Sequence, residues 1–228
     1  MMFGRLHSCY FLWYYVVFEC IIEDPKLTNS IHPTDQYVRL PGPIELCHLM
    51  LQARIRRGDF VVDATVGNGH DTAFLAELVG PDGLVFGFDI QAEAIDQTSQ
   101  RLLEAGFENR VRLVQCGHEN AVETIDDFHA DRISAVVFNL GYLPGGDKKI
   151  VTTPRTTVQA LQRFASIISA EGLITVVVYP GHEGGMEETK AVVEWASSLD
   201  SDKFLVTSYG FVNRPHHPPF SILLERRK

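Results

Sequence analysis

One segment of the chain, Asp63-Ala-Thr-Val-Gly-Asn-Gly-His-Asp-Thr72, combines glycines, carboxylates and hydroxyls in ten residues. Glycines at 67 and 69 let the backbone turn tightly and approach a ligand closely. Asp63 could meet a cationic amino group directly or through the loop, and Asp71 and Thr72 are equally well placed, unless they only cap the following helix. The segment therefore predicts a turn that binds a nucleotide-like ligand. Its candidate binding residues are Asp63, Thr65, Gly67, Asn68, Gly69, Asp71 and Thr72.

A further carboxylate, Asp89, follows the glycines by about 20 residues, the spacing at which an acidic residue meets the hydroxyls of a ribose. Ile90 and Gln91 would then flank an adenine. His118 and Glu119 could border the adenine edge, or they could simply begin a helix. These residues predict that the ligand contains adenosine.

A nicotinamide dinucleotide would require a different glycine pattern. Gly67-Asn-Gly69 is followed by Asp71 and Thr72, whereas Gly-x-Gly-x-x-Gly supplies a third glycine for close helix packing beside a pyrophosphate. A carboxylate at position 71 would also repel a pyrophosphate, but it suits the positively charged amino acid part of a sulfonium cofactor. The turn therefore favours S-adenosylmethionine over NAD.

A long loop rich in glycine and proline, Asn139-Leu-Gly-Tyr-Leu-Pro-Gly-Gly-Asp147, follows another apolar run. Loops of this length are usually functional. Asn139 stands where amino-methylating enzymes carry Asn or Asp before Pro-Pro-aromatic. There the side-chain oxygen accepts a hydrogen bond from the target amine and directs the nitrogen lone pair at the methyl group. Tyr142 could stack on a base, or it could belong to the core.

An alkylamine must be neutral to attack a methyl group, so the enzyme could bind the minor neutral form or remove a proton. Asp147 and His182 are the candidate bases, although His182 could be a plain loop residue. The candidate catalytic residues are Asn139, Tyr142, Asp147 and His182. Basic loop residues could hold RNA phosphates, or they could be scattered surface charge. The candidate RNA contacts are Lys148, Lys149, Arg155, Arg214 and His216.

The elements that must position these residues follow from the hydrophobic pattern, in which apolar runs alternate with amphipathic stretches. The predicted strands are 60–63, 83–89, 111–115, 133–138 and 173–179, with a closing antiparallel pair at 204–212 and 220–224. The predicted helices are 44–56, 70–78, 92–105, 156–169 and 186–199. This alternation predicts a mostly parallel sheet covered by helices on both faces. In such α/β folds ligands bind at the carboxyl ends of the strands, where the candidate residues fall.

The composition agrees with one domain, which we expect at residues 40–228 behind an N-terminal extension, 1–39. The net charge of −9 is unlike that of a dedicated nucleic-acid binder, so any RNA contact must come from a local basic patch. The cysteines, Cys9, Cys20, Cys47 and Cys116, form no Cys-x-x-Cys pair. We therefore expect neither a disulfide scaffold nor a bound metal.

The N-terminal extension contains a nearly uninterrupted apolar run at residues 10–22. The run is shorter than the roughly 20 residues of a spanning helix, it is broken by Glu19, and it lacks the cleavage site of a secretory signal. We expect no membrane partner. A cytoplasmic location is the simplest interpretation, and a plastid or mitochondrial one follows if the extension is a targeting segment.

Four blocks carry a resemblance to one family. They are the segment that begins at Asp63, Gly87-Phe-Asp-Ile-Gln91, Phe138-Asn-Leu-Gly-Tyr-Leu-Pro-Gly-Gly-Asp-Lys148 and Tyr179-Pro-Gly-His-Glu183. From about Leu40 onward the chain resembles the rRNA methylase family of class I S-adenosylmethionine methyltransferases. The resemblance implies a Rossmann-like fold with a seven-stranded sheet. It also implies N-methylation of the 5-aminomethyl group of the wobble (2-thio)uridine in the tRNA anticodon, which gives the methylaminomethyl product.

One departure from the family concerns the C-terminal loop, which reads His216-His-Pro-Pro219 where the family typically has Asn-Asn-Pro-Pro. Three other functions stay open: a methyltransferase acting on rRNA or a small molecule, a non-catalytic RNA-binding protein on a methyltransferase fold, and a nicotinamide oxidoreductase. The intact glycine turn with Asp89 argues against the non-catalytic alternative. The oligomeric state is also open, a homodimer included.

Overall fold

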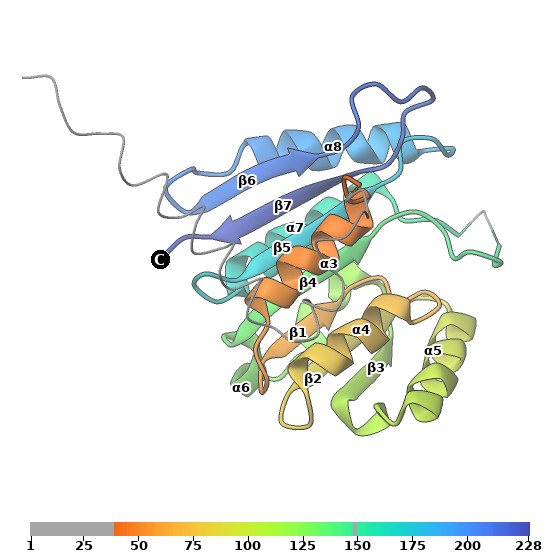
Figure 1. The fold of residues 1–228 in the computed structure, drawn as a ribbon, viewed down its shortest axis with the longest axis vertical. Helices are drawn as coiled ribbons and strands as arrows, with labels where there is room; N and C mark the ends of the chain where they lie inside the picture. The colour runs from red at the N-terminus through yellow and green to blue at the C-terminus, as the bar shows by residue number, and fades with distance from the viewer. Residues whose placement is uncertain (1–38, 148–149) are drawn as a thin grey trace, which may run out of the picture. The chain divides into compact units, whose positions relative to one another are not determined.

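A seven-stranded sheet lies at the centre of the part of the chain that the computed structural model describes, residues 39–147 and 150–228 (Figure 1). The strand order is β3-β2-β1-β4-β5-β7-β6. Strands β1 to β5 run parallel, and β7 pairs antiparallel with both β5 and β6. The strands are β1 Phe60–Asp63, β2 Leu84–Asp89, β3 Val111–Gln115, β4 Ile133–Asn139, β5 Leu173–Val178, β6 Phe204–Tyr209 and β7 Phe220–Arg226. The predicted sheet, with its antiparallel C-terminal pair, is confirmed.

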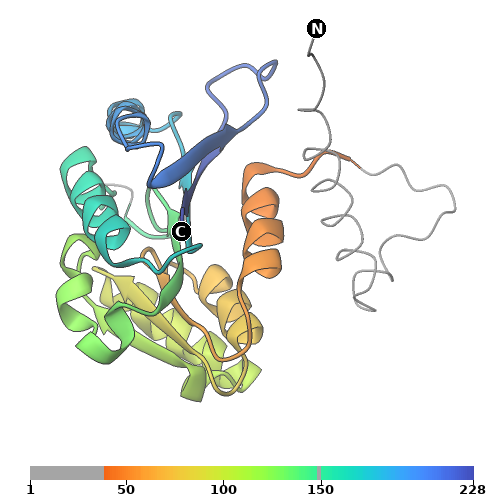
Figure 2. The same cartoon turned by 90° about the vertical axis from the view of Figure 1, so that its left-hand side faces the viewer.

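Helices cover both faces of the sheet (Figure 2). One face carries α3 Pro43–Arg54, α4 His70–Val79 and α5 Ala92–Ala105. The other carries α6 Asp127–Ala130, α7 Pro154–Ile167 and α8 Gly185–Ser197. Three 3-10 turns, Glu108–Arg110, His118–Asn120 and Val122–Thr124, complete the described elements. The order of the sheet reverses between β1 and β4, so the carboxyl ends of these two strands border the crevice where ligands bind in such folds.

The core consists of two apolar layers, because successive side chains of a strand point to opposite faces of the sheet. Val62, Phe86 and Phe138 pack on the face of α7 and α8, whereas Val61 and Val85 pack on the face of α3 and α4. All five are fully buried, and burying each such side chain contributes roughly 1.5–3 kcal/mol. The layers hold the strand ends, and thus the loops after them, in a fixed arrangement.

Most element boundaries lie within two residues of the sequence prediction. Helix α7 begins at Pro154 instead of residue 156, because the Thr153 side chain accepts a hydrogen bond from the Thr156 N–H and proline suits the first helical position. Strand β6 ends at Tyr209, three residues before the predicted end. Helix α6 and the 3-10 turns at 108–110 and 122–124 were not predicted. These differences move Arg155 from a loop into the first turn of α7.

Residues Pro41 to Lys228 form a compact unit. The predicted extension lies, up to residue 38, outside the described residues, so its boundary and its role stay predictions. Within the described ranges, every helix is too short or too polar to cross a bilayer.

Candidate functional site

The glycine turn after β1 is shaped by two left-handed residues. Gly67 and Gly69 have φ values of 51° and 76°, which favour glycine over residues with a side chain. A Cβ atom at Gly69 would lie 2.5 Å from the Oγ1 atom of Thr98, a contact too short for any side chain. The Thr98 hydroxyl in turn donates a hydrogen bond to the Gly67 carbonyl. The backbone of the turn is therefore held directly against the Thr98 side chain of helix α5.

Asp63 and Thr72 lie beneath this turn, where both are fully buried. The Thr72 hydroxyl donates to Asp63 at 2.6 Å, and the Thr65 N–H donates to the other Asp63 oxygen at 3.1 Å. Helix α4 has no side-chain cap, since its N-cap is Gly69. Thr72 therefore does not cap the helix, and neither Asp63 nor Thr72 lines the cavity described below. Both brace the loop from below, so the prediction that Asp63 acts through the loop stays open, whereas direct contact of either side chain with a ligand in that cavity is not supported.

Asp89, at the end of β2, is tied to the same turn. One of its carboxylate oxygens accepts the Gly67 N–H and the other accepts the Gln91 N–H, both at 2.9 Å. Each oxygen keeps a lone pair for a further donor. A carboxylate held in this way by two backbone donors can accept two hydrogen bonds from neighbouring hydroxyls, as the diol of a ribose requires.

A cavity of about 900 Å³ opens at the carboxyl ends of the parallel strands. Most predicted site residues line it. On the side of β1 to β3 these are Thr65, Gly67, Asn68, Asp71, Asp89, Ile90, Gln91, His118 and Glu119. On the side of β4 and β5 they are Asn139, Tyr142, His182 and His216. The cavity thus brings together the residues predicted for the cofactor and those predicted for the methyl acceptor.

The sequence analysis left open whether His118 borders the ligand site or begins a helix. His118 lines the cavity and also begins a 3-10 turn. The side chain is almost fully buried and packs edge-on against Phe138. Burial lowers the pKa of His118 despite the nearby Glu119 carboxylate, so the ring is neutral near pH 7. Its Nε2 atom has no hydrogen-bond partner within the described part of the chain. This atom is therefore a buried polar group left unsatisfied at the wall of the cavity.

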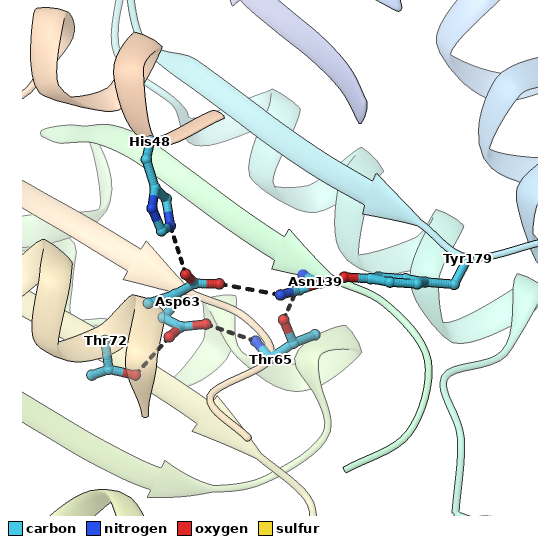
Figure 3. Close-up of polar contacts among 7 residues, drawn as sticks. His48, Asp63, Thr65, Thr72, Asn139 and Tyr179 are labelled. Carbon is cyan, nitrogen blue, oxygen red and sulfur yellow. Dashed lines mark hydrogen bonds and ion pairs between the residues drawn. The ribbon is translucent and has the colours of Figure 1, made fainter. Parts of the chain in front are cut away.

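Asn139 lies at the centre of a hydrogen-bonded network at the end of β4 (Figure 3). Its backbone N–H donates to the Thr65 hydroxyl at 2.7 Å. Its side-chain amide donates to Asp71 at 3.3 Å, and its side-chain oxygen accepts the Tyr179 hydroxyl at 2.8 Å. His48 of α3 donates to the other oxygen of Asp71 at 2.7 Å. These partners fix which way the carboxamide of Asn139 points.

Tyr179 acts as a hydrogen-bond donor in this network. Burial, and then the nearby Asp71 carboxylate, raise the pKa of Tyr179 to about 12. The phenol therefore keeps its proton at physiological pH and donates it to the oxygen of Asn139. That oxygen has a second lone pair, which a further donor can use.

The loop after β4 carries Tyr142 and faces His182. The Tyr142 ring is 38% exposed, so it does not belong to the core, and its centroid lies 6.0 Å from that of His182 in an edge-on arrangement. The Nδ1 atom of His182 is 2.8 Å from the Glu183 carbonyl, which can only accept, so Nδ1 carries the proton. The Nε2 atom of His182 is buried and has no partner among the described residues. With Nδ1 protonated, Nε2 is the ring nitrogen that carries the lone pair.

A buried carboxylate holds the base of the same loop. Glu188 of α8 is 2% exposed and accepts the hydroxyls of Thr152 and Thr157 at 2.8 and 2.6 Å. The Thr152 oxygen also accepts the Gly141 N–H at 2.9 Å, and the Gly141 carbonyl accepts the Thr152 N–H. Both ends of the loop are therefore fastened to α8.

Several predicted residues lie away from the cavity wall. Asp147 is exposed in the loop, and Arg155 is exposed at the start of α7. Arg214 lies in the loop between β6 and β7, with its guanidinium over the Phe211 ring. Lys148 and Lys149 fall outside the described residues. Of the two candidate bases, the geometry therefore favours His182 over Asp147.

Three residues of the site were not predicted: His48, Tyr179 and Glu188. His48 precedes β1, so no strand end points to it. Tyr179 follows β5 at the same sheet edge as Asn139, a position that could have singled it out. Glu188 lies four residues before the buried Val192, and a carboxylate on the apolar face of a helix is a usable signal.

Comparison with known proteins is consistent with this geometry. Residues 85–225 match the protein family described as "Putative rRNA methylase". A chloroplastic tRNA (mnm(5)s(2)U34)-methyltransferase from Arabidopsis thaliana is 37% identical over 189 residues, which are 80% of this chain and 69% of that protein.

Two solved structures have the same fold. A "putative rRNA-methylase" from Clostridium thermocellum is 42% identical with a TM-score of 0.80, over 83% of this chain and 100% of that one. A "putative methyltransferase" from Streptococcus mutans, in complex with SAH, is 32% identical with a TM-score of 0.74, over 82% of this chain and 99% of that one. The chain therefore belongs to the rRNA methylase family and is an S-adenosylmethionine-dependent methyltransferase.

Proposed function

We propose that this enzyme N-methylates the 5-aminomethyl group of the wobble (2-thio)uridine in tRNA. The observation that carries the proposal is the fixed carboxamide of Asn139. Its oxygen accepts the Tyr179 hydroxyl, and its amide nitrogen donates to Asp71. A side-chain oxygen at the end of β4 that accepts from an amine orients the nitrogen lone pair, and positioning of this kind supplies a large part of the rate in group transfer.

The residues of the cavity fit S-adenosylmethionine. Asp89, with one backbone donor on each oxygen, would hold the ribose hydroxyls. Ile90 and His118 would contact the adenine, and His118 has an Nε2 atom without a described partner. Asp71 would attract the ammonium group of the methionine part. Gly67 allows the backbone to approach closely because of its left-handed conformation.

When bound, S-adenosylmethionine supplies an electrophilic methyl group. Asn139 accepts a hydrogen bond from the acceptor amine and so aims its lone pair, while the proton that the amine must lose passes to Nε2 of His182. The Nδ1–H of His182 is held by the Glu183 carbonyl, which keeps the ring in the tautomer that accepts at Nε2. Tyr142, exposed on the rim, would stack on the uracil.

The choice of tRNA over rRNA rests on the relatives. The Arabidopsis relative carries tRNA U34 in its name, whereas the family description refers to rRNA. His216 and His217, at the departure from the family pattern, have φ values of 64° and 49°. Asn and His are both among the residues that tolerate this conformation. The loop can therefore keep its backbone shape when Asn-Asn becomes His-His, which supports the same class of substrate.

The decisive experiment is mass spectrometry of nucleosides from tRNA that lacks the modification, incubated with the protein and S-adenosylmethionine. We expect a gain of one methyl on the 5-aminomethyl nucleoside.

Asn139→Ala should mainly slow methyl transfer, whereas Asp89→Ala should mainly weaken cofactor binding. Tyr179→Phe, which keeps the ring but cannot donate to Asn139, should lower kcat about tenfold and leave KM for S-adenosylmethionine nearly unchanged.

Transfer to rRNA with none to this tRNA would contradict the proposed substrate. Wild-type rates in all three variants would contradict the proposed site. Phe128→Leu, at an exposed position of α6 outside the cofactor cavity, serves as a folding control in the same tRNA reaction.

The location of the enzyme is a separate proposal. The Arabidopsis relative is named as chloroplastic, which supports an organellar location, with residues 1–39 as the targeting segment, over a cytoplasmic one. Fusing residues 1–39 to a fluorescent protein tests this: signal spread through the cytosol would contradict it.

A further inference from the structure

A second cavity, of about 430 Å³, lies beside the first. Its walls come from the first half of α8, from the end of β6 and from the start of β7. The two cavities share His217, Pro218 and Pro219. A single thin wall therefore separates the proposed acceptor site from a second hollow of a size that a nucleobase can enter.

The second cavity contains a buried hydroxyl without a partner. Thr189 of α8 contributes to its wall and is 7% exposed. The Oγ1 atom of Thr189 makes no hydrogen bond to any described residue. A buried hydroxyl left in this state costs free energy, and a polar group on a ligand would satisfy it. Its position indicates an occupant with hydrogen-bonding atoms as well as apolar surface.

Part of the wall is aromatic and has a cation beside it. Tyr209 and Phe211 have ring centroids 6.2 Å apart, and the Tyr209 hydroxyl is anchored to the Pro41 carbonyl at 2.8 Å. The Arg214 guanidinium lies 4.8 Å from the centroid of Phe211. Aromatic rings and guanidinium planes are the surfaces on which unpaired RNA bases stack, and arginine also pairs with phosphate.

The wall between the cavities is stiff. His216 and His217 are held in the left-handed region, and Pro215, Pro218 and Pro219 restrict the backbone on both sides of them. A ridge of this kind can keep apart two groups that occupy the neighbouring cavities.

We propose that the second cavity binds the base of the nucleotide adjacent to the methyl acceptor. This inference rests on the proposed function in so far as the acceptor is part of an RNA chain. The base stacks on Phe211, its edge hydrogen-bonds to the Thr189 hydroxyl, and Arg214 contacts the phosphate. An apolar protein side chain would leave the Thr189 hydroxyl unsatisfied and would make no use of Arg214.

The test uses the full-length protein and two anticodon stem-loop RNAs that carry 2-aminopurine immediately 5′ or 3′ of the wobble uridine. Titration with wild-type protein should change the fluorescence of one of the two probes, since stacking quenches 2-aminopurine. Phe211→Leu should weaken RNA binding about fivefold or more and restore the fluorescence, as expected for the loss of one base–aromatic stack. Thr189→Val, which has nearly the same shape, should weaken binding of the same probe.

Phe128→Leu is the matched control. Phe128 is 65% exposed on α6, just before β4 begins, and Arg132 lies 4.8 Å from its ring centroid. Phe128 and Arg132 therefore form the same kind of pair as Phe211 and Arg214, but near the start of β4 instead of at the carboxyl ends of the strands. Phe128→Leu should leave RNA binding unchanged. Circular dichroism melting of each variant establishes that it is folded.

Unchanged affinity and unchanged fluorescence in folded Phe211→Leu and Thr189→Val would overturn the second subsite, and so would a wild-type protein that binds neither RNA. The outcome is separable from that of the proposed function. If the stem-loop binds through Phe211 but its amine is not methylated, the proposed function fails and the subsite stands. If methylation occurs and both variants bind normally, only the subsite fails.

Discussion

At the scale of single residues, the glycine turn depends on a carboxyl group that does not line the cavity. Asp63 is fully buried beneath the turn and accepts hydrogen bonds from Thr65 and Thr72. Burial, and then the neighbouring Asp71 carboxylate, raise the pKa of Asp63 to about 7. Near neutral pH this buried group is therefore close to its titration midpoint, which makes it a source of pH-dependent stability.

We expect the free energy of unfolding to fall as pH rises from about 4 to about 7. The folded Asp63 carboxyl keeps its proton up to about pH 7, whereas in the unfolded chain it loses that proton near its ordinary value of 3.8. Between these values the folded state binds more protons, so raising the pH favours unfolding, by at most about 1.4 kcal/mol per pH unit from this group. Urea unfolding at pH 5 and pH 7.5 measures the slope.

Asp63→Asn should remove this contribution, because an amide can still accept from the Thr65 N–H and can donate to the Thr72 oxygen. The stability of the variant relative to the wild type should therefore increase with pH. Asp82→Asn, at an exposed position, controls for the substitution itself. If the free energy of unfolding changes with pH in the same way in Asp63→Asn and in the wild type, Asp63 does not titrate in this range.

At the scale of elements, the loop that follows β4, residues 140–153, is held in place by helix α8 as well as by the strand. The two ends of the loop meet at Gly141 and Thr152, and Glu188 receives the Thr152 hydroxyl from within the helix. The loop carries Tyr142, and His182 lies in the segment that leads into α8. A helix on one face of the sheet thus sets the position of side chains around the acceptor.

Glu188→Ala should lower the free energy of unfolding by roughly 2–4 kcal/mol, because it leaves the buried hydroxyls of Thr152 and Thr157 without their acceptor. Amide hydrogen exchange at residues 140–153 should become faster. Urea denaturation and hydrogen exchange provide the two measurements. Glu187→Ala, at the exposed neighbouring position, should change stability by no more than about 0.5 kcal/mol. Equal effects of the two substitutions would contradict the role of Glu188.

At the scale of the whole molecule, the proposed cofactor cavity joins parts of the fold that are distant in sequence. The cavity is bordered by the ends of five parallel strands and by the loop before β7. A ligand in the cavity can contact all of these segments at once only when the chain is folded. Binding should therefore stabilise the protein as a whole and not one element of it.

We expect S-adenosylmethionine at about 100 times its Kd to add about 2.7 kcal/mol to the stability and to raise Tm by several degrees. NAD at the same concentration should leave Tm unchanged. The negatively charged Asp71 lines the cavity and should repel the pyrophosphate of NAD. Asp89→Ala should largely abolish the shift. Differential scanning fluorimetry measures all three, and a larger shift with NAD would reverse the interpretation of the glycine turn.

The fold and the cofactor side of the site follow from local features of the sequence. Apolar runs of four to seven residues, separated by amphipathic stretches, specify the strands and helices. Gly67 falls shortly after β1 and Asp89 at the end of β2, and the topology of a parallel sheet brings the carboxyl ends of its strands to one edge. For this reason their place at the cavity could be predicted without knowledge of any side-chain contact.

The tertiary structure alone decided which polar groups face the cavity and which support it. Asp63 and Asp71 are only eight residues apart in the same turn, yet the first is buried beneath the loop and the second lines the cavity. His48 and Tyr179 reach Asp71 and Asn139 from α3 and from the end of β5. Such contacts join residues far apart in the chain, and their geometry depends on how helices and strands pack, which a local sequence pattern does not encode. The sequence of the glycine turn thus predicts the class of ligand, whereas tertiary packing determines which side chains face the cavity.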